Sequence, residues 1–435
     1  MASTPISATI FTYRVGFGDC FLLRFRYPEE GDRHLLIDFG TTGIPDDEEA
    51  DLMVRVAEDI KAKCGGRLEA VVATHRHADH ISGFATNKAR TGSGDIIAAL
   101  DIDTVVQPWT EAPEAEEEWL GPEISSDKRS LRGRVQALSA MHGMAETVLR
   151  ALDTKALDKA PKEVRDQLQF IGRDNVKNLS AVENLMKMGR NHVYAWHGSD
   201  SGLDRLLPGV TTRVLGPPSL RQTETIRKQR SRDPDEYWHF ALKGMNSDVM
   251  YAETGEEDRL FPGHPTRPGG KLPVEVRWIA GRLNEAREGQ FLSLVTALDQ
   301  QMNNTSLILL FEVGGKKLLF PGDAQIENWR YALSQPEIVS LLEDVDVYKV
   351  GHHGSLNATP KSLWKSFRKK NRKPVAGRLT TLLSTKPGKH GHEKDRTEVP
   401  RLSLLKELAE QSHLHSTHLM PDGTLYQEIE IDLRD

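Results

Sequence analysis

The motif that most constrains this chain is H-x-H-x-D-H, at residues 75–80. It directly follows residues 68–73, an apolar stretch typical of a buried β-strand. The motif supplies imidazoles and a carboxylate, which borderline divalent ions such as zinc prefer as ligands. A loop leaving a strand can direct His75 and His77 at one ion and turn Asp79 and His80 toward a second. The motif therefore predicts a metal site. Two alternatives stay open: Asp79 could orient an imidazole from behind, or the motif could be a solvated polar loop.

Composition narrows the class of protein. The chain has 435 residues, which is enough to bury a large core, and a net charge of -6. This charge argues against a generally basic nucleic-acid coat, although a local basic patch is compatible with it. With two cysteines, Cys20 and Cys64, a zinc site must rest on His and Asp. No signal-peptide pattern and no apolar stretch of about 18 residues is visible, so we expect a cytoplasmic protein without membrane contact.

Hydrophobic periodicity predicts strands in both terminal regions. Expected strands near the N-terminus cover residues 8–15, 20–27, 34–40 and 68–73, with a helix at 48–63. Further strands are expected at 211–215, 306–313, 317–323, 345–350 and 424–433, with a helix at 324–333. This alternation predicts an α/β sandwich whose helices cover the sheets.

Two segments interrupt the pattern. Residues 111–210 carry charged residues, Leu, Ala and Met at helical spacing, which predicts a mainly helical insertion. Residues 219–300 are polar and have no clear period, which predicts an irregular insertion that could serve as a lid. We expect a single domain over residues 1–435 that carries both insertions.

More ligand-type residues follow predicted strands in the C-terminal half. Asp323 ends the strand at 317–323, where an acid either caps the next helix or bridges two metal ions. His352 and His353 follow the strand at 345–350 and lie between glycines, which let the backbone turn sharply. The position of all three motifs at strand exits predicts one shared site.

Together these residues resemble the metallo-β-lactamase superfamily, and within it the hydrolase domain of ComEC-type DNA-uptake proteins. The resemblance rests on H-x-H-x-D-H, on G-D-A at 322–324 and on H-H-G-S at 352–355, which stand in the family's order. It covers residues 8–85, 211–218 and 303–360 and omits the insertions. It implies a four-layer αββα sandwich with two divalent metal ions, zinc or manganese, at one edge.

The resemblance also implies a role for each ligand-type residue. The first ion would be held by His75, His77 and Asp323, and the second by Asp79, His80, Asp323 and His353. His352 would face the substrate, and Asp79 and Asp323 would take part in catalysis. Either His352 or His353 could be the ligand, and we favour His353. Many family members have a further first-site histidine, for which this chain offers His142, His192, His197, His239 and His264.

Other residues are candidates for supporting roles. Asp19 and Asp38 could orient the ligating histidines or belong to turns. Asn304 and Ser306 are candidates for hydrogen bonds to substrate or backbone. His390 and His392 could complete a substrate pocket or lie in a solvated loop.

The function implied is a hydrolase in which a metal-bridged hydroxide attacks a phosphodiester, with nucleic acid or a nucleotide as substrate. Two basic clusters, at residues 361–373 and 227–232, could hold a phosphate backbone or be solvated helix faces. One alternative is hydrolysis of another ester, an amide or a thioester. A further alternative is a metal-stabilised effector module whose insertions bind a protein partner.

Overall fold

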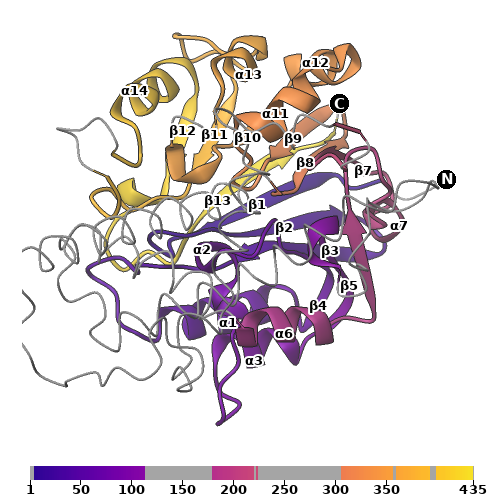
Figure 1. The fold of residues 1–435 in the computed structure, drawn as a ribbon, viewed down its shortest axis with the longest axis vertical. Coiled ribbons are helices and arrows are strands. Elements are labelled where there is room, and N and C mark those ends of the chain that lie inside the picture. The colour runs from indigo at the N-terminus through magenta and orange to yellow at the C-terminus, as the bar shows by residue number, and fades with distance from the viewer. Residues whose placement is uncertain are drawn as a thin grey trace, which may run out of the picture.

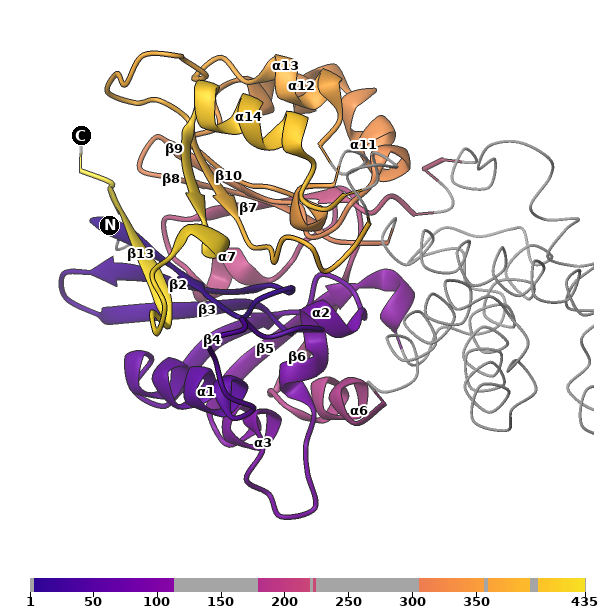
Figure 2. The same cartoon turned by 90° about the vertical axis from the view of Figure 1, so that its left-hand side faces the viewer.

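The computed structural model describes residues 4–112, 179–219, 222–223, 305–355, 359–391 and 398–434. Within these residues two β-sheets pack face to face, and helices cover the outer face of each (Figures 1 and 2). The layers run helix, sheet, sheet, helix, which confirms the αββα sandwich expected from the sequence.

The first sheet has seven strands in the order β13-β1-β2-β3-β4-β5-β6. Strands β13, β1, β2 and β3 pair antiparallel, whereas β3, β4, β5 and β6 pair parallel. The strand bounds are β1 Ser7–Tyr13, β2 Cys20–Tyr27, β3 Gly31–Phe39, β4 Arg67–Val72, β5 Asp101–Pro108, β6 Asn191–Ala195 and β13 Tyr426–Asp432.

The second sheet has six strands in the order β12-β11-β10-β9-β8-β7. Strands β7, β8 and β9 pair antiparallel, and β9 to β12 pair parallel. A turn at Gly314 and Gly315 joins β8 to β9. The strand bounds are β7 Thr211–Gly216, β8 Ile308–Val313, β9 Lys316–Phe320, β10 Val347–Lys349, β11 Thr380–Leu383 and β12 His413–Ser416.

Three buried clusters hold the layers together. The central one lies between the sheets and includes Phe21, Leu309 and Phe320. A second packs α1 (Leu52–Lys63), α3 (Ser93–Ala98) and α6 (Leu179–Lys187) on the first sheet. A third packs α11 (Ile326–Leu333), α12 (Pro336–Glu343), α13 (Lys361–Ser366) and α14 (Leu402–Gln411) on the second. Burial of these apolar side chains is the main source of the sandwich's stability.

The two expected insertions are only partly described. Residues 179–210 contain α6, the edge strand β6 and the short helix α7 (Leu203–Leu206). Residues 113–178 and 224–304 lie outside the described residues, and with them most of both expected insertions, including the lid. Among the helices that the structure does describe, none has the length and apolar character needed to cross a bilayer.

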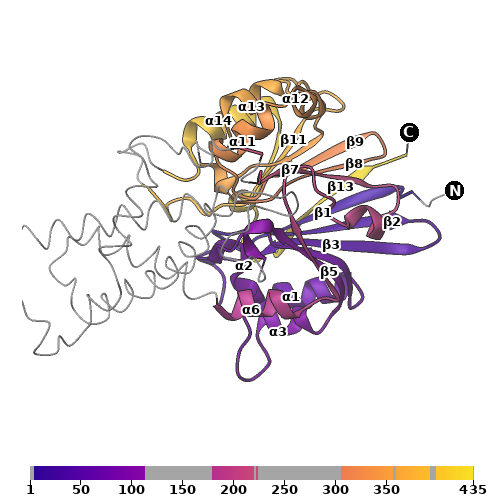
Figure 3. The ribbon, with the colours of Figure 1, turned by 45° about the vertical axis from the view of Figure 1, so that its right-hand side comes forward.

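The topology brings the predicted ligand segments to one edge. In each sheet the parallel strands end at the same side, so the loops after β3, β4, β9, β10 and β11 gather there (Figure 3). The backbone N–H of Leu307 donates to the carbonyl of Thr74 at 2.9 Å, which joins the loop after β4 to the start of β8 in the facing sheet. The candidate site lies at this junction between the sheets.

Candidate metal site

The loop after β4 explains how one short motif can point in two directions. Thr74 to His77 form a loop outside any helix or strand, and α2 (Ala78–Ile81) begins directly after His77. The first two histidines therefore lie on the loop, whereas Asp79 and His80 lie on the helical turn. Gly18 and Gly40 pack against this turn, because a Cβ on Gly40 would lie 2.5 Å from the backbone nitrogen of His80.

His75, His77 and Asp79 form the first ligand-type group. Each offers an atom within 4.8 Å of the others, and the Nε2 atom of His75 lies 3.0 Å from the Nδ1 atom of His77. Burial lowers the pKa of His75 well below its usual value, and the neighbouring His80 and His77 lower it further. A neutral imidazole is the form that binds a metal ion.

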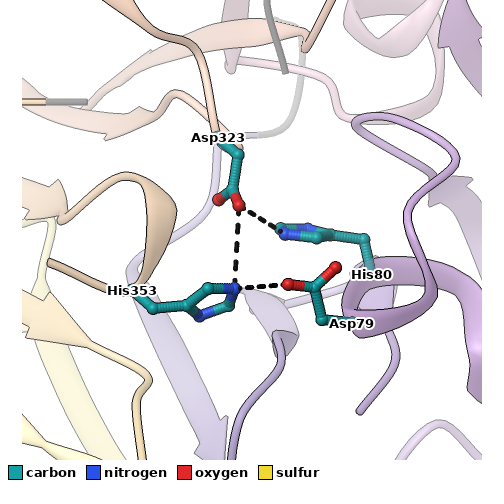
Figure 4. Close-up of side chains that lie close together, drawn as sticks. All are labelled: Asp79, His80, Asp323 and His353. Carbon is teal, nitrogen blue, oxygen red and sulfur yellow. Dashed lines mark hydrogen bonds and ion pairs between the residues drawn. The ribbon is translucent and has the colours of Figure 1, made fainter. Parts of the chain in front are cut away.

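Asp79, His80, Asp323 and His353 form the second group (Figure 4). The Nε2 atom of His353 lies 2.8 Å from Oδ2 of Asp79 and 3.6 Å from Oδ2 of Asp323. The Nε2 atom of His80 lies 3.1 Å from the same Asp323 oxygen. Side chains from the loops that follow strands β4, β9 and β10 thus converge on one point.

This point has the chemistry of a divalent cation site. The Nε2 atom of His80 and the Oδ2 atom of Asp323 are buried, and neither makes a hydrogen bond among the described residues. Burial raises the pKa of Asp323, but the facing imidazoles outweigh burial and hold that pKa well below its usual value. An ionised carboxylate with two converging imidazole nitrogens matches the ligand set of zinc. The residues present therefore fit a bound metal ion.

Hydrogen bonds behind the imidazoles set their orientation. The Nδ1 atom of His80 lies 2.7 Å from Oδ2 of Asp38, and the Nδ1 atom of His353 lies 3.1 Å from the carbonyl oxygen of Ser384. When each Nδ1–H donates to its oxygen, each Nε2 atom is left facing Asp323. Asp38, which the sequence offered as an orienting partner or a turn residue, thus lies behind the His80 ring.

The structure distinguishes His352 from His353. Both have positive φ, at 43° and 50°, so the turn after β10 holds two residues in a conformation that costs energy outside glycine. The ring of His353 is buried within the second group, whereas the ring of His352 lies outside both groups and its Nδ1 atom is 3.0 Å from Oγ of Ser355. The backbone N–H of His352 donates to Oδ1 of Asp323 at 2.9 Å. This geometry favours His353 as the ligand.

Two other predicted residues lie near the site. Asp19 is fully buried, and its backbone N–H donates to the carbonyl of Asp79 at 2.8 Å. Ser306 is also buried, and its carbonyl accepts a hydrogen bond from Asn328 at 2.9 Å.

His390 is linked to the site through Phe17. The Phe17 ring contacts the rings of both His353 and His390, with centroids 4.3 Å apart in each pair. Burial lowers the pKa of His390 to about 4. Asn304 and His392 lie outside the described residues.

The two described candidates for a further first-site histidine, His192 and His197, belong to neither ligand-type group. His192 lies on β6, and His197 follows it and approaches the carbonyl of Leu215 at 2.9 Å through its Nδ1 atom. Among the described residues, the first group contains no histidine besides His75 and His77. His142, His239 and His264 are outside the described residues.

Part of the basic cluster at residues 361–373 lies away from the ligand-type residues. This cluster could hold a phosphate backbone or be a solvated helix face, and its Lys369 pairs with Asp346 at 2.8 Å, before β10 begins. The ligand-type residues follow β10, so they and Asp346 lie at opposite ends of this strand. Arg368 and Arg372 pair with Glu343 and Glu410 at 2.6 and 3.6 Å. This part of the cluster is neutralised and lies at the opposite edge of the sheet. The cluster at 227–232 lies outside the described residues.

Sequence reasoning missed two charged side chains at the site. Lys349 is buried beside Asp19 and Asp323, and Arg76, between the two first-group histidines, is held by Glu111 at 2.5 Å. A lysine inside the apolar strand before H-H-G-S was an available signal, because lysine is rarely buried without a partner.

Comparison with known proteins supports the fold and the general chemistry. Residues 13–167 match the family model of the metallo-beta-lactamase superfamily, whose members are mostly metal-dependent hydrolases. The matched segment contains the H-x-H-x-D-H motif and, in its described part, strands β2 to β5. A sequence comparison with curated proteins found no match.

Proposed function

We propose that this protein is a dinuclear metal-dependent hydrolase of the ComEC-like type that cleaves phosphodiesters. The observation that carries the proposal is the convergence of Asp79, His80, Asp323 and His353 beside His75 and His77. With divalent cations bound there, water becomes acidic enough to supply a nucleophile near neutral pH and a phosphoryl oxygen is polarised.

The arrangement suggests how the ligands are divided. His75 and His77 would hold one ion, and His80, Asp323 and His353 the other. Asp79 belongs to both ligand-type groups, so its carboxylate lies where it could serve either ion. Asp323, the shared ligand implied by the resemblance, lies within 4.8 Å of the other members of the second group.

The remaining residues would position the substrate and move protons. His352 is only partly buried and is held next to Asp323 by its own backbone N–H. We place it at the substrate side, where its ring can donate a proton to the leaving oxygen. The pair of Arg76 and Glu111 fixes the segment between His75 and His77.

A phosphodiester is favoured over other substrates for two reasons. A pair of cations suits in-line displacement at phosphorus, because it stabilises both the attacking and the leaving oxygen. The motifs also resemble those of a DNA-uptake hydrolase domain, which favours nucleic acid or a nucleotide. The neutralised cluster at 368–372 adds no support, so phosphate recognition would rest on the cations themselves.

The test is hydrolysis of bis(p-nitrophenyl) phosphate with manganese or zinc. Asp79→Ala and Asp323→Ala are expected to abolish activity, and Asp32→Ala, an exposed acid on β3, serves as the matched control. Cleavage of acyl substrates alone would favour an esterase, amidase or thioesterase. Metal binding without hydrolysis of either class would favour the effector module.

A further inference from the structure

Lys349 is a buried cation inside the candidate metal site. Its side chain is 2% exposed and lies on β10, in the middle of the second sheet. The ammonium forms an ion pair with Asp19, donates to the carbonyl of Gly322 at 3.1 Å and lies 3.4 Å from Oδ1 of Asp323. It therefore holds both the turn before Asp323 and the carboxylate itself.

The two oxygens of Asp323 have different partners. Oδ1 faces the Lys349 ammonium and the backbone N–H of His352, whereas Oδ2 faces the Nε2 atoms of His80 and His353. If Oδ1 lost the ammonium, one backbone hydrogen bond would be left to resist rotation of the carboxylate. The direction of Oδ2 toward the imidazoles thus depends on Lys349.

Lys349 also balances negative charge at the site. Asp19, Asp38, Asp79 and Asp323 are four carboxylates around this point. In the described part of the chain, Lys349 is the one lysine or arginine ion-paired with any of them.

We propose that Lys349 is a positioning residue: it fixes the outer oxygen of Asp323, so that the inner oxygen is directed at the imidazoles before a cation binds. The inference rests on the proposed metal binding. It also offers an account of the third ligand-type group, Asp19, Asp38 and His80, because the Lys349 ammonium already forms an ion pair with Asp19.

The competing explanation is a buried ion pair that only stabilises the fold. Removing one partner of a buried pair leaves the other charge uncompensated, whereas removing both can restore stability. We therefore compare Asp19→Asn with the double variant Asp19→Asn/Lys349→Met. Both lack the Asp19 ion pair, but only Asp19→Asn keeps the ammonium on Asp323.

The measurement is zinc and manganese affinity by titration calorimetry, together with the absorption spectrum of the cobalt-loaded protein. If Lys349 positions Asp323, the double variant should bind zinc and manganese at least tenfold more weakly than Asp19→Asn does, and its cobalt spectrum should change. Losses of this size are typical when a residue that orients a metal ligand is removed. Equal affinities and spectra would overturn the inference. If wild type itself binds neither metal, the proposed function fails instead. Because the double variant removes one positive and one negative charge, its net charge equals that of wild type, and the comparison holds even where Lys349→Met alone does not fold.

Discussion

The Nδ1 atom of His80 lies 2.7 Å from Oδ2 of Asp38. Asp38 lies on β3, which pairs with β4, the strand that leads to the metal motif. Asp38 is itself held by the backbone N–H and the hydroxyl of Thr74, each at 2.7 Å. The carboxylate is therefore fixed from the protein side, and the His80 ring can hold one orientation without a cation.

Asp38→Asn tests this relationship. Asp38 has φ of 55°, a conformation that asparagine tolerates, so the substitution removes charge with little backbone cost. We expect metal affinity to fall by about 10–100-fold, measured by titration calorimetry. Asp32→Asn, on the exposed end of the same strand, is the control. Unchanged affinity in Asp38→Asn would show that Asp38 does not orient His80.

Gly322→Ala tests the close approach of the two ligand loops. A Cβ at Gly322 would lie 2.7 Å from Cβ of Thr74, whereas one at Gly315 would meet nothing within 4 Å. Both glycines have positive φ, at 54° and 66°, so each alanine carries a backbone cost of about 1–2 kcal/mol. Denaturant unfolding should show a larger loss of stability for Gly322→Ala. Equal losses in the two variants would mean that the loops separate without cost.

The buried His34, which lies away from the site, should make the stability of the fold depend on pH in the acid range. Burial lowers the pKa of His34, and Glu69 opposes this only in part. The unfolded chain therefore takes up the proton at a higher pH than the folded protein does. Stability should be constant with respect to this group above about pH 6.5 and should fall as the pH drops below that value.

Replacing His34 with glutamine removes this proton uptake. In metal-free protein, melting temperatures between neutral and mildly acidic pH should fall less steeply for His34→Gln than for wild type. Parallel curves would show that the burial of His34 has no consequence for folding at acid pH.

The basic cluster is not expected to contribute to nucleic-acid cleavage. Because Lys369 pairs with Asp346 at the edge opposite the metal site, Lys369→Ala/Lys370→Ala should leave nucleic-acid cleavage and its dependence on salt unchanged. Cleavage measured over a salt series checks this. A weaker salt dependence in the variant would place nucleic acid on this surface after all.

Local patterns predicted the elements with two buried faces. The strand at 20–27 matches β2, the strand at 68–73 matches β4 within one residue, and the strand at 345–350 contains the shorter β10. Strand β6 was not predicted, because it is an edge strand with mostly half-buried residues and so lacks a strong apolar pattern. Strand β5 was missed as well, and its Asp101 and Asp103 break the apolar run.

The site residues likewise divide into those that local sequence predicts and those whose contacts require the folded chain. The two histidine motifs are contiguous in the chain, so their ligand character is visible without a fold. The contact between Lys349 and Asp19 forms only when the two sheets close on each other, because Lys349 lies on the second sheet and Asp19 directly precedes β2 of the first. The position of Lys369 also depends on the fold, because Lys369 precedes β11, which runs parallel to β10.

The most direct test of this account is the metal content of the purified protein after incubation with excess zinc or manganese and removal of free ion. Elemental analysis should find two ions per chain in wild type and fewer in Asp79→Ala, since Asp79 belongs to both ligand-type groups. Protein that retains no stoichiometric metal under these conditions would contradict the account.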